Sequence, residues 1–385
     1  MLNRRYLLKQ AMVAMAATPA LASSALRASP AGRDLAALCV HTRYDATLKA
    51  TLPRAAQLRI VARSGAPAVA GGAYRWHGAP DGGACFPSAA GGWIYVSNSE
   101  LPKGTATTMG GVGALRFNAA GEVVDSYPIL ENTRLNCAGG RSLWGTWLSC
   151  EEYGESGLVY ECDPEGKKPA RARPAMGAFT HEAVAMDPAT GRAYLTEDQP
   201  NGCLYRFTPA RPGDLAEGLL ELAVAEGMHL TWHQVPDASA SKRPLRYQVP
   251  EAARFRGGEG IVYSDGAIYF TTKHDNRVWR LQLADDRLSV VYDATLHDSA
   301  VLSGVDNLEI APGGELLVAE DGGDMQIVAL LDDYRPAPLL TLHEQPESEI
   351  TGPAFSPDGS RLYFSSQRGF SGRSEDGLTY ELILP

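Results

Sequence analysis

The stretch that indicates the fold lies at residues 181–200, which read HEAVAMDPATGRAYLTEDQP. A polar start leads into a short apolar run, a turn containing Pro188 follows, and a second apolar run ends on acidic residues. Two short apolar runs separated by turn residues are typical of a β-hairpin. The stretch therefore predicts two antiparallel strands whose polar ends lie side by side.

Five further stretches of the chain follow the same pattern: residues 81–100, 136–154, 258–275, 305–323 and 351–369. Most neighbouring stretches start 45 to 55 residues apart, which matches a propeller blade of roughly 40–50 residues. We therefore predict an all-β chain folded as a six-bladed β-propeller, with a β-sandwich or a pair of smaller β domains as the alternative. The propeller should cover residues 81–385, with an insertion at about 211–255 in the one long interval and residues 23–80 joining it.

The N-terminus reads as an export signal. Residues 3–9, NRRYLLK, precede a short apolar run at 11–17, and small residues at 19–22 suit cleavage. The paired arginines resemble a twin-arginine signal, and an ordinary secretory signal is the alternative. The apolar run is too short for a stable membrane span. We expect residues 1–22 to address the chain to the twin-arginine export machinery, and the mature protein to be periplasmic or secreted.

The net charge of the chain is −10, and loss of Arg4, Arg5 and Lys9 with the signal would leave about −13. An acidic body of this kind argues against nucleic acid as a partner. It suits a protein that gathers cations, although acidity can also serve solubility alone. The sequence has neither a G-x-S-x-G motif nor a P-loop, which argues against a serine nucleophile and a nucleotide-binding loop.

The repeat places many polar residues at one end of the predicted blades. A hairpin's first residue and its last residue lie at the same end, so these positions should converge on one mouth of the central channel. Crowded carboxylates repel one another unless cations lie between them. Oxygen ligands suit Ca²⁺, and a thiolate among carboxylates suits a transition metal such as iron. We therefore predict a metal site in the channel, while noting that a single Glu at a strand end is ordinarily a solvated charge. The residues at these positions are Asn98, Glu100, Asn136, Cys137, Glu151, Glu152, His181, Glu182, Glu197, Asp198, Glu259, Lys273, His274, Asp275, Asp306, Asn307, Glu320, Asp321, Gln367 and Arg368.

The sequence resembles the PhoX family of alkaline phosphatases. The resemblance rests on NCAGG at 136–140 and WGTWLSCEE at 144–152, with further matches at 181–182, 258–260, 306–307 and 320–322. It implies a six-bladed propeller, exported by the twin-arginine route, that holds two ferric ions and several calcium ions and hydrolyses phosphate monoesters. The chain is shorter than the long members, and residues 98–100, NSE, stand where those tend to carry Asn-His-Glu.

The resemblance also implies roles for individual residues. The implied iron ligands are Cys137, Glu152, Glu182 and Glu259. The calcium ligands that we expect are Asn98, Glu100, Glu151, Glu320 and Asp321.

Three cations are the predicted catalytic residues. Lys273 and Arg368 end repeats at the same mouth, and Arg256 precedes Gly257, so each can contact phosphate oxygens of a small-molecule ester. Each can equally balance a neighbouring carboxylate. Two other functions are compatible with the pattern: a calcium-dependent propeller lactonase or esterase, and a non-catalytic binding module. We expect the protein to act as a monomer.

Overall fold

The computed structural model describes residues 34–101, 110–297, 300–322 and 324–385. The predicted signal peptide at 1–22 lies outside these ranges. In the described part of the chain, no helix has the length and apolar character to cross a membrane.

The described residues form one short α-helix, a set of short 3₁₀ turns and five β-sheets. The helix is α1 (Leu35–Val40), and the 3₁₀ turns are η1 (Gly154–Ser156), η2 (Pro174–Met176), η3 (Leu245–Tyr247), η4 (Lys273–Asp275), η5 (Ala294–Leu296), η6 (Asp332–Tyr334), η7 (Gly369–Ser371) and η8 (Ser374–Asp376). Two 4-stranded sheets contain β4 (Pro80–Pro87), β5 (Trp93–Ser99), β6 (Gly110–Phe117) and β7 (Val123–Thr133), and β8 (Asn136–Arg141), β9 (Trp147–Glu151), β10 (Val159–Cys162) and β11 (Arg171–Ala172). The 9-stranded sheet contains β12 (His181–Met186), β13 (Ala193–Glu197), β14 (Leu204–Arg211), β15 (Asp214–Glu226), β16 (His229–Gln234), β17 (Gly258–Ser264), β18 (Ala267–Thr272), β19 (Arg277–Gln282) and β20 (Arg287–Asp293). The 6-stranded sheet contains β21 (Val305–Ile310), β22 (Leu316–Glu320), β23 (Gln326–Leu330), β24 (Pro336–Leu342), β1 (Thr42–Asp45) and β2 (Ala50–Pro53), and the last 4-stranded sheet contains β25 (Ile350–Phe355), β26 (Arg361–Ser366), β27 (Leu378–Ile383) and β3 (Gln57–Arg63).

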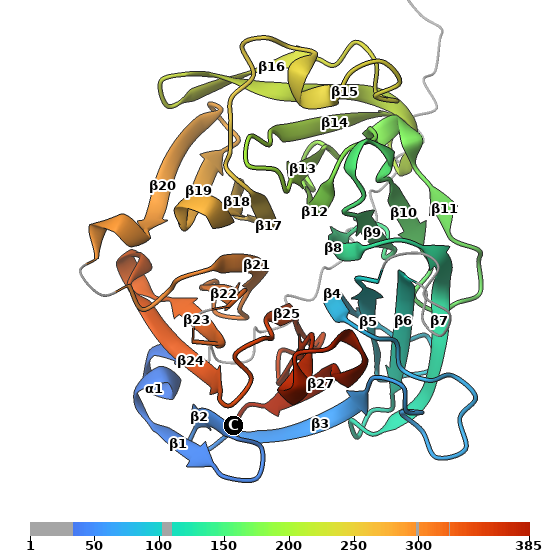
Figure 1. The fold of residues 1–385 in the computed structure, drawn as a ribbon, viewed down its shortest axis with the longest axis vertical. Coiled ribbons are helices and arrows are strands. Elements are labelled where there is room, and N and C mark those ends of the chain that lie inside the picture. Colours follow the sequence, from blue (N-terminus) through green and yellow to red (C-terminus); the bar gives the residue numbers. More distant parts are fainter. Residues whose placement is uncertain (1–33, 102–109, 298–299, 323) are drawn as a thin grey trace, which may run out of the picture.

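The sheets are arranged around a central axis like the blades of a propeller (Figure 1), which confirms the all-β class and the propeller-like arrangement. The strands nearest the axis are β4, β8, β12, β17, β21 and β25, and each contacts the next around a closed ring. In the 9-stranded sheet, β12–β16 and β17–β20 meet where His229 of β16 pairs with Arg287 of β20.

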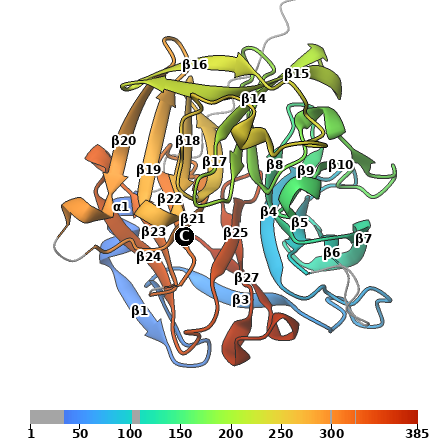
Figure 2. The same ribbon diagram turned by 45° about the horizontal axis from the view of Figure 1, so that its top comes forward.

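The N-terminal strands complete two of the sheets. β3 pairs antiparallel with β27, so the sheet that holds the C-terminal strand takes its outer strand from the start of the chain. β2 pairs with β24 and β1 with β2, on the outer edge of the neighbouring sheet. The turned view in Figure 2 shows β1 and β3 on the outside of the ring, away from β4 and β25.

Each axial strand begins with a bulge. In β8, for example, Asn136 pairs with Glu151 of β9 and Gly139 with Ser149, so β8 has one residue more than its partner over this interval. The same irregularity occurs near the start of β4, β12, β17, β21 and β25. A bulge re-aims side chains relative to the regular alternation of a strand. The six bulges therefore change the direction of side chains in the same way in each axial strand, at one end of the channel.

The axial strands approach closely because glycines of one strand lie against the backbone of the next. A Cβ atom on Gly82 would lie 2.4 Å from the Cα of Ala138, and one on Gly260 would lie 2.5 Å from the amide nitrogen of Leu308. At Gly140 a Cβ atom would lie 1.8 Å from the carbonyl oxygen of Val184. No real Cβ can occupy these positions, so the glycines permit the narrow ring.

We expect the Gly140→Ala substitution to lower the free energy of unfolding by about 3 kcal/mol, because the added methyl must displace the backbone of β12. Urea unfolding would measure the change. Gly313→Ala is the matched control: its Cβ would meet the carboxylate end of the flexible Glu315 side chain, which can move. Equal stability of the two variants would contradict a close-packed ring at Gly140.

Candidate metal centre at the channel mouth

Three buried glutamates end second strands of sheets and point into their own sheet. They are Glu151 at the end of β9, Glu197 at the end of β13 and Glu320 at the end of β22. Their carboxylates accept hydrogen bonds from nearby backbone amides, and each therefore holds a loop in place. The donors are the amides of Arg134 and Leu158 for Glu151, Cys203 for Glu197, and Ser303 and Gln326 for Glu320.

The residue that follows each second strand has the opposite orientation, because successive side chains of an extended chain alternate. Glu152 lies near Glu100 and Cys137, and Asp198 and Asp321 both lie near the ammonium group of Lys273. These side chains meet at the channel mouth. The six residues in this position are Glu100, Glu152, Asp198, Lys273, Asp321 and Gln367.

The bulges supply a second set of side chains to the same place. The first bulge residue is acidic or a cysteine in five of the axial strands, and glycine in β25. Gln367 donates from Nε2 to Asp81 Oδ2 at 2.6 Å and to Glu100 Oε2 at 2.8 Å, which ties the two sets together. The first bulge residues are Asp81, Cys137, Glu182, Glu259, Asp306 and Gly352.

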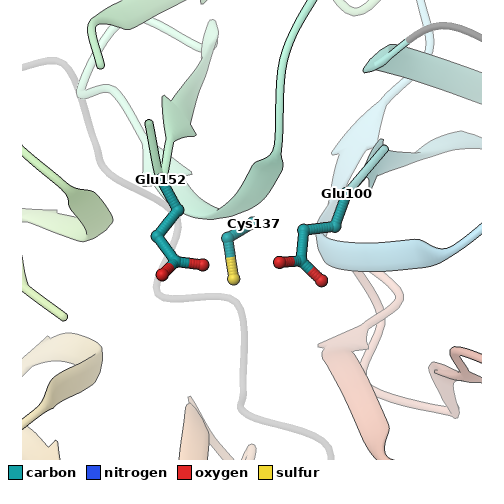
Figure 3. Close-up of side chains that lie close together, drawn as sticks. All are labelled: Glu100, Cys137 and Glu152. Carbon is teal, nitrogen blue, oxygen red and sulfur yellow. The ribbon is translucent and has the colours of Figure 1, made fainter. Parts of the chain in front are cut away.

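Among the residues that the structure describes, three groups of potential ligand atoms lie at the mouth. In the first group, Glu100, Cys137 and Glu152 point toward one another (Figure 3), and their ligand atoms lie within 4.8 Å of each other. The second group contains Glu182, Glu259 and Asp306, and the third contains Asp306, Asp321 and Glu349. Asp306 belongs to both of these groups, and Cys137 Sγ lies 3.2 Å from Glu182 Oε1. The three groups thus form one continuous row.

Burial, with repulsion between neighbouring carboxylates, favours the protonated form of several of these side chains. Burial, with repulsion from Glu100 and Asp198, raises the pKa of Glu152 to about 8, and burial raises the pKa of Asp306 to about 7. The pKa values of Glu182 and Glu259 lie well above the usual range, again chiefly through burial. Burial also raises the pKa of the Cys137 thiol well above its usual value. A bound cation would reverse this balance and displace the protons.

The donor sets fit metal ions by chemistry and by size. Two ligands on opposite sides of an ion bound at 2.3–2.6 Å lie about 5 Å apart, and ligand atoms within 4.8 Å of one another are compatible with binding one ion. The first group offers a sulfur and two carboxylates, which suits a transition metal, and the other two groups offer oxygen alone, which suits Ca²⁺.

The structure places the predicted ligands in two classes. Six of them join the three groups: Glu100, Cys137, Glu152, Glu182, Glu259 and Asp321. Glu151 and Glu320 lie outside the groups, bound to the backbone amides described above. Asn98 also lies outside: its Oδ1 accepts from Trp147 Nε1 at 2.8 Å and Ser149 Oγ at 3.0 Å, so it braces β5 against β9.

Four mouth carboxylates were absent from the predicted ligands. Asp198 and Asp306 were predicted to lie at the mouth but were not assigned as ligands; they occupy the positions of Glu152 and Cys137 in their repeats. Asp81 occupies the same bulge position as Cys137, so a residue-by-residue alignment of the repeats could have identified it. Glu349 directly precedes β25 and lies outside the six repeated stretches, so the repeat pattern did not indicate it.

The predicted catalytic cations differ in their surroundings. Lys273 Nζ lies 2.8 Å from Glu259, 3.3 Å from Asp321 and 3.7 Å from Asp198. Burial works against its charge, but these carboxylates hold the pKa of Lys273 above its usual value. Arg368 lies 2.8 Å from Glu349.

Arg256 is exposed and has no ion-pair partner within 4.0 Å in the described part of the chain. It adjoins Gly257, where a Cβ atom would lie 3.2 Å from Asp198 Oδ1. The structure therefore places Arg256 beside the mouth as an unpaired cation.

The opposite end of the channel has a different character. A cavity of about 440 Å³ there is lined mainly by apolar side chains, including Val184, Ile261 and Leu308. Its charged residues are Arg141 and Glu309, which form an ion pair at 3.0 Å. Within the described residues, the three ligand groups therefore lie at the other mouth, where carboxylates outnumber the cations Lys273 and Arg368.

Comparison with known proteins gave a family match and a set of similar folds. The model of the family described as alkaline phosphatase PhoX matches residues 87–156 and 153–290. Among solved structures, Pseudomonas fluorescens PhoX in complex with vanadate, a transition state analogue, is 16% identical, with a TM-score of 0.72 over 90% of this chain and 98% of that chain. The gluconolactonase XC5397 from Xanthomonas campestris is 13% identical, with a TM-score of 0.53 over 90% of this chain and 94% of that chain. Among curated proteins there was no significant match. At these identities the solved structures show a shared fold.

Proposed function

The chain belongs to the alkaline phosphatase PhoX family, and on that premise we propose that it is an exported enzyme that hydrolyses phosphate monoesters with metal ions held at the channel mouth. The observation that carries the proposal is the row formed by Glu100–Cys137–Glu152, Glu182–Glu259–Asp306 and Asp306–Asp321–Glu349. Buried carboxylates this close together are costly without cations, and a phosphate ester is a ligand that such cations attract.

We assign the ions by donor chemistry. Cys137 with Glu152 would hold ferric iron, because the thiolate favours a transition metal. The resemblance to the PhoX family adds Glu182 and Glu259 to this site, and Glu182 Oε1 lies 3.2 Å from Cys137 Sγ. Asp306, Asp321 and Glu349 would hold calcium through oxygen alone. Glu100 faces Cys137 and would complete the first of these sites (Figure 3).

Bound ions would neutralise the phosphate and make a nucleophile available at ordinary pH. The chain's own cations act around them. Lys273 and Arg368 are held at the mouth by carboxylates and can donate to the phosphate oxygens as charge develops. Among the described residues Arg256 has no carboxylate partner within 4.0 Å, so it can bind the ester without breaking an ion pair there.

We also propose the remaining features of the architecture and location. The 9-stranded sheet would count as two blades, because the single pair His229–Arg287 joins β16 to β20. The ring would then contain six blades. Residues 1–22 would direct export through the twin-arginine machinery to the periplasm or beyond. Residues 23–80 would join the propeller of 81–385, and the mature enzyme would act as a monomer.

A metal analysis tests the proposed function directly. Protein purified without chelators is expected to contain iron and calcium, to absorb visible light through the iron–thiolate bond, and to release phosphate from p-nitrophenyl phosphate. The Cys137→Ser variant should lose the absorbance band together with activity. Cys39→Ser is the control, because Cys39 lies by Ala337, far from the mouth, and its variant should retain both. Calcium without iron, and no phosphate release, would contradict the iron site.

A calcium-dependent lactonase is the second candidate. The all-oxygen group Glu182–Glu259–Asp306, with Asn307 donating to Asp306 Oδ1 at 2.8 Å, is the observation that favours it. Hydrolysis of a sugar lactone by protein that holds calcium alone would support this function in place of phosphatase activity.

A further inference from the structure

A basic segment joins β16 to β17. Residues 235–257 contain five cations, Lys242, Arg243, Arg246, Arg254 and Arg256, against two acidic residues, Asp237 and Glu251. The chain as a whole has a net charge of −10, so this segment differs in sign from the rest. Such a local reversal of charge indicates a surface that attracts anions.

Backbone contacts fix the segment to the rim of the channel mouth. The amide of Phe255 donates to Gly202 at 2.9 Å, and the amide of Gly257 donates to Gln199 at 2.9 Å. Gln199 follows Asp198 directly in the chain, and Asp198 lies near Lys273 at the mouth. Asn201, which donates a hydrogen bond to Tyr247 of the segment, is three residues from Asp198. The Cα atoms of Asn201 and Asp198 are therefore at most about 11 Å apart, so the segment lies close to the mouth.

Tyr247 lies at the centre of the basic segment. The guanidinium carbons of Arg243, Arg246 and Arg254 lie 6.0, 5.1 and 5.6 Å from its ring centroid, within the range of cation–π contacts. Its hydroxyl accepts a hydrogen bond from Asn201 Nδ2 at 2.8 Å, and this bond, followed by the one from Arg246, lowers the pKa of Tyr247. The tyrosine thus holds several guanidinium groups together.

These arginines are of two kinds. Arg246 is buried and pairs with Glu197 at 2.7 Å and Glu155 at 3.0 Å, so it anchors the segment. Arg243, Arg254 and Arg256 are exposed, and within the described ranges none has a carboxylate within 4.0 Å. Arg254 Nη1 donates to the carbonyl oxygen of Asn201 at 3.3 Å and to Cys203 Sγ at 3.1 Å, which ties this arginine to the rim. A guanidinium without a carboxylate partner still has N–H donors that can bind an oxyanion.

We propose that Arg243 and Arg254, which lie against Tyr247 at the rim, bind a second anionic group on the leaving-group side of the substrate. The enzyme would then prefer phosphate monoesters whose leaving group carries a carboxylate or a further phosphate. This inference rests on the proposed function, because it places the scissile phosphate at the neighbouring metal centre. The rim would also draw such esters past the acidic residues of the mouth.

Matched pairs of esters test the preference. We would compare kcat/KM for glycerol 3-phosphate with that for 3-phosphoglycerate, and for fructose 6-phosphate with that for fructose 1,6-bisphosphate. The wild-type enzyme should favour the more anionic member of at least one pair, and the preference should weaken as salt is raised. A preference confined to one pair would identify the oxyanion that the rim accepts.

Variants locate the preference on the rim. Arg243→Ala combined with Arg254→Ala should lower kcat/KM for the favoured ester about 5- to 10-fold, and should change kcat/KM for the partner that lacks the second anionic group by less than about twofold. Arg243→Ala alone, which removes an exposed side chain, should show a smaller loss in the same direction. Arg211→Ala is the control, because this exposed arginine lies at the end of β14, near Glu217.

Two outcomes would overturn the inference, and they differ from failure of the proposed function. Equal kcat/KM within both pairs, or a preference that survives the double variant, would show that the rim does not select the substrate, while p-nitrophenyl phosphate is still hydrolysed. No phosphate release from any ester would remove the proposed function and this inference with it.

Discussion

Replacing Glu152 by Gln is expected to lower kcat/KM for phosphate esters by about 10²- to 10³-fold, because the change removes a charge and a ligand atom where charge must be stabilised. The carboxylate of Glu152 faces Cys137 and Glu100 (Figure 3), and its pKa of about 8 without a cation reflects burial and the repulsion that a metal would relieve. Elemental analysis and steady-state kinetics on the same sample would measure the loss of metal and of activity together.

Glu151→Gln is a matched control that changes the same residue type one position earlier. Glu151 accepts hydrogen bonds from the amides of Arg134 and Leu158 and lies outside the ligand groups. Its substitution should lower the free energy of unfolding by about 1–3 kcal/mol, because a buried amide loses its acceptor, and should leave the metal content unchanged. A Glu152→Gln variant that retains its metals, or a Glu151→Gln variant that loses them, would contradict the assignment of the first group.

Replacing Arg246 by Ala is expected to lower the free energy of unfolding by about 3–5 kcal/mol, the cost of leaving one member of a buried ion pair without its partner. The side chain of Glu197 is 0% exposed, and that of Arg246 is 10% exposed. Burial raises the pKa of Glu197 even with Arg246 beside it, so loss of the guanidinium would leave a carboxylate with little solvation. Urea-induced unfolding would measure the effect.

Two further variants separate the parts of this ion-pair network. Glu155→Gln removes the charge of the second partner of Arg246. The side chain of Glu155 is 45% exposed, so this change should lower the free energy of unfolding by less than about 1 kcal/mol. The combination of Arg246→Ala with Glu197→Gln should recover part of the loss, because no uncompensated charge then remains. A cost below about 1 kcal/mol for Arg246→Ala alone would contradict the anchoring role.

The repeat in the sequence determined a large part of the fold. Residues 181–200 form the antiparallel pair β12 and β13 with a turn at Pro188, and the other five stretches likewise contain paired strands. These hairpins are local, so apolar runs and turn residues were enough to predict them. The sequence also predicted that polar residues at the strand ends would lie close together, because the two ends of a hairpin meet.

Tertiary structure alone decided which of those polar residues face the channel. Glu151 and Glu152 are neighbours of the same type, but the alternation of side chains along β9 sends the first into its sheet and the second toward Cys137. The bulge in β8 adds one residue to β8 relative to β9 and so shifts the alternation of side chains along β8. Nothing in the local sequence marks the position of this bulge.

Contacts between distant parts of the chain were also beyond the sequence. The pairing of β3 with β27, the position of Glu349 beside Asp306, and the anchoring of the basic segment by Arg246 and Glu197 join residues that are far apart in the sequence. Hydrophobic patterning reports which side of a strand is buried, and it does not report which distant partner covers that side. The sequence by itself therefore determined the hairpins and the chemistry of their ends, and the closing of the ring decided which of those groups form the mouth.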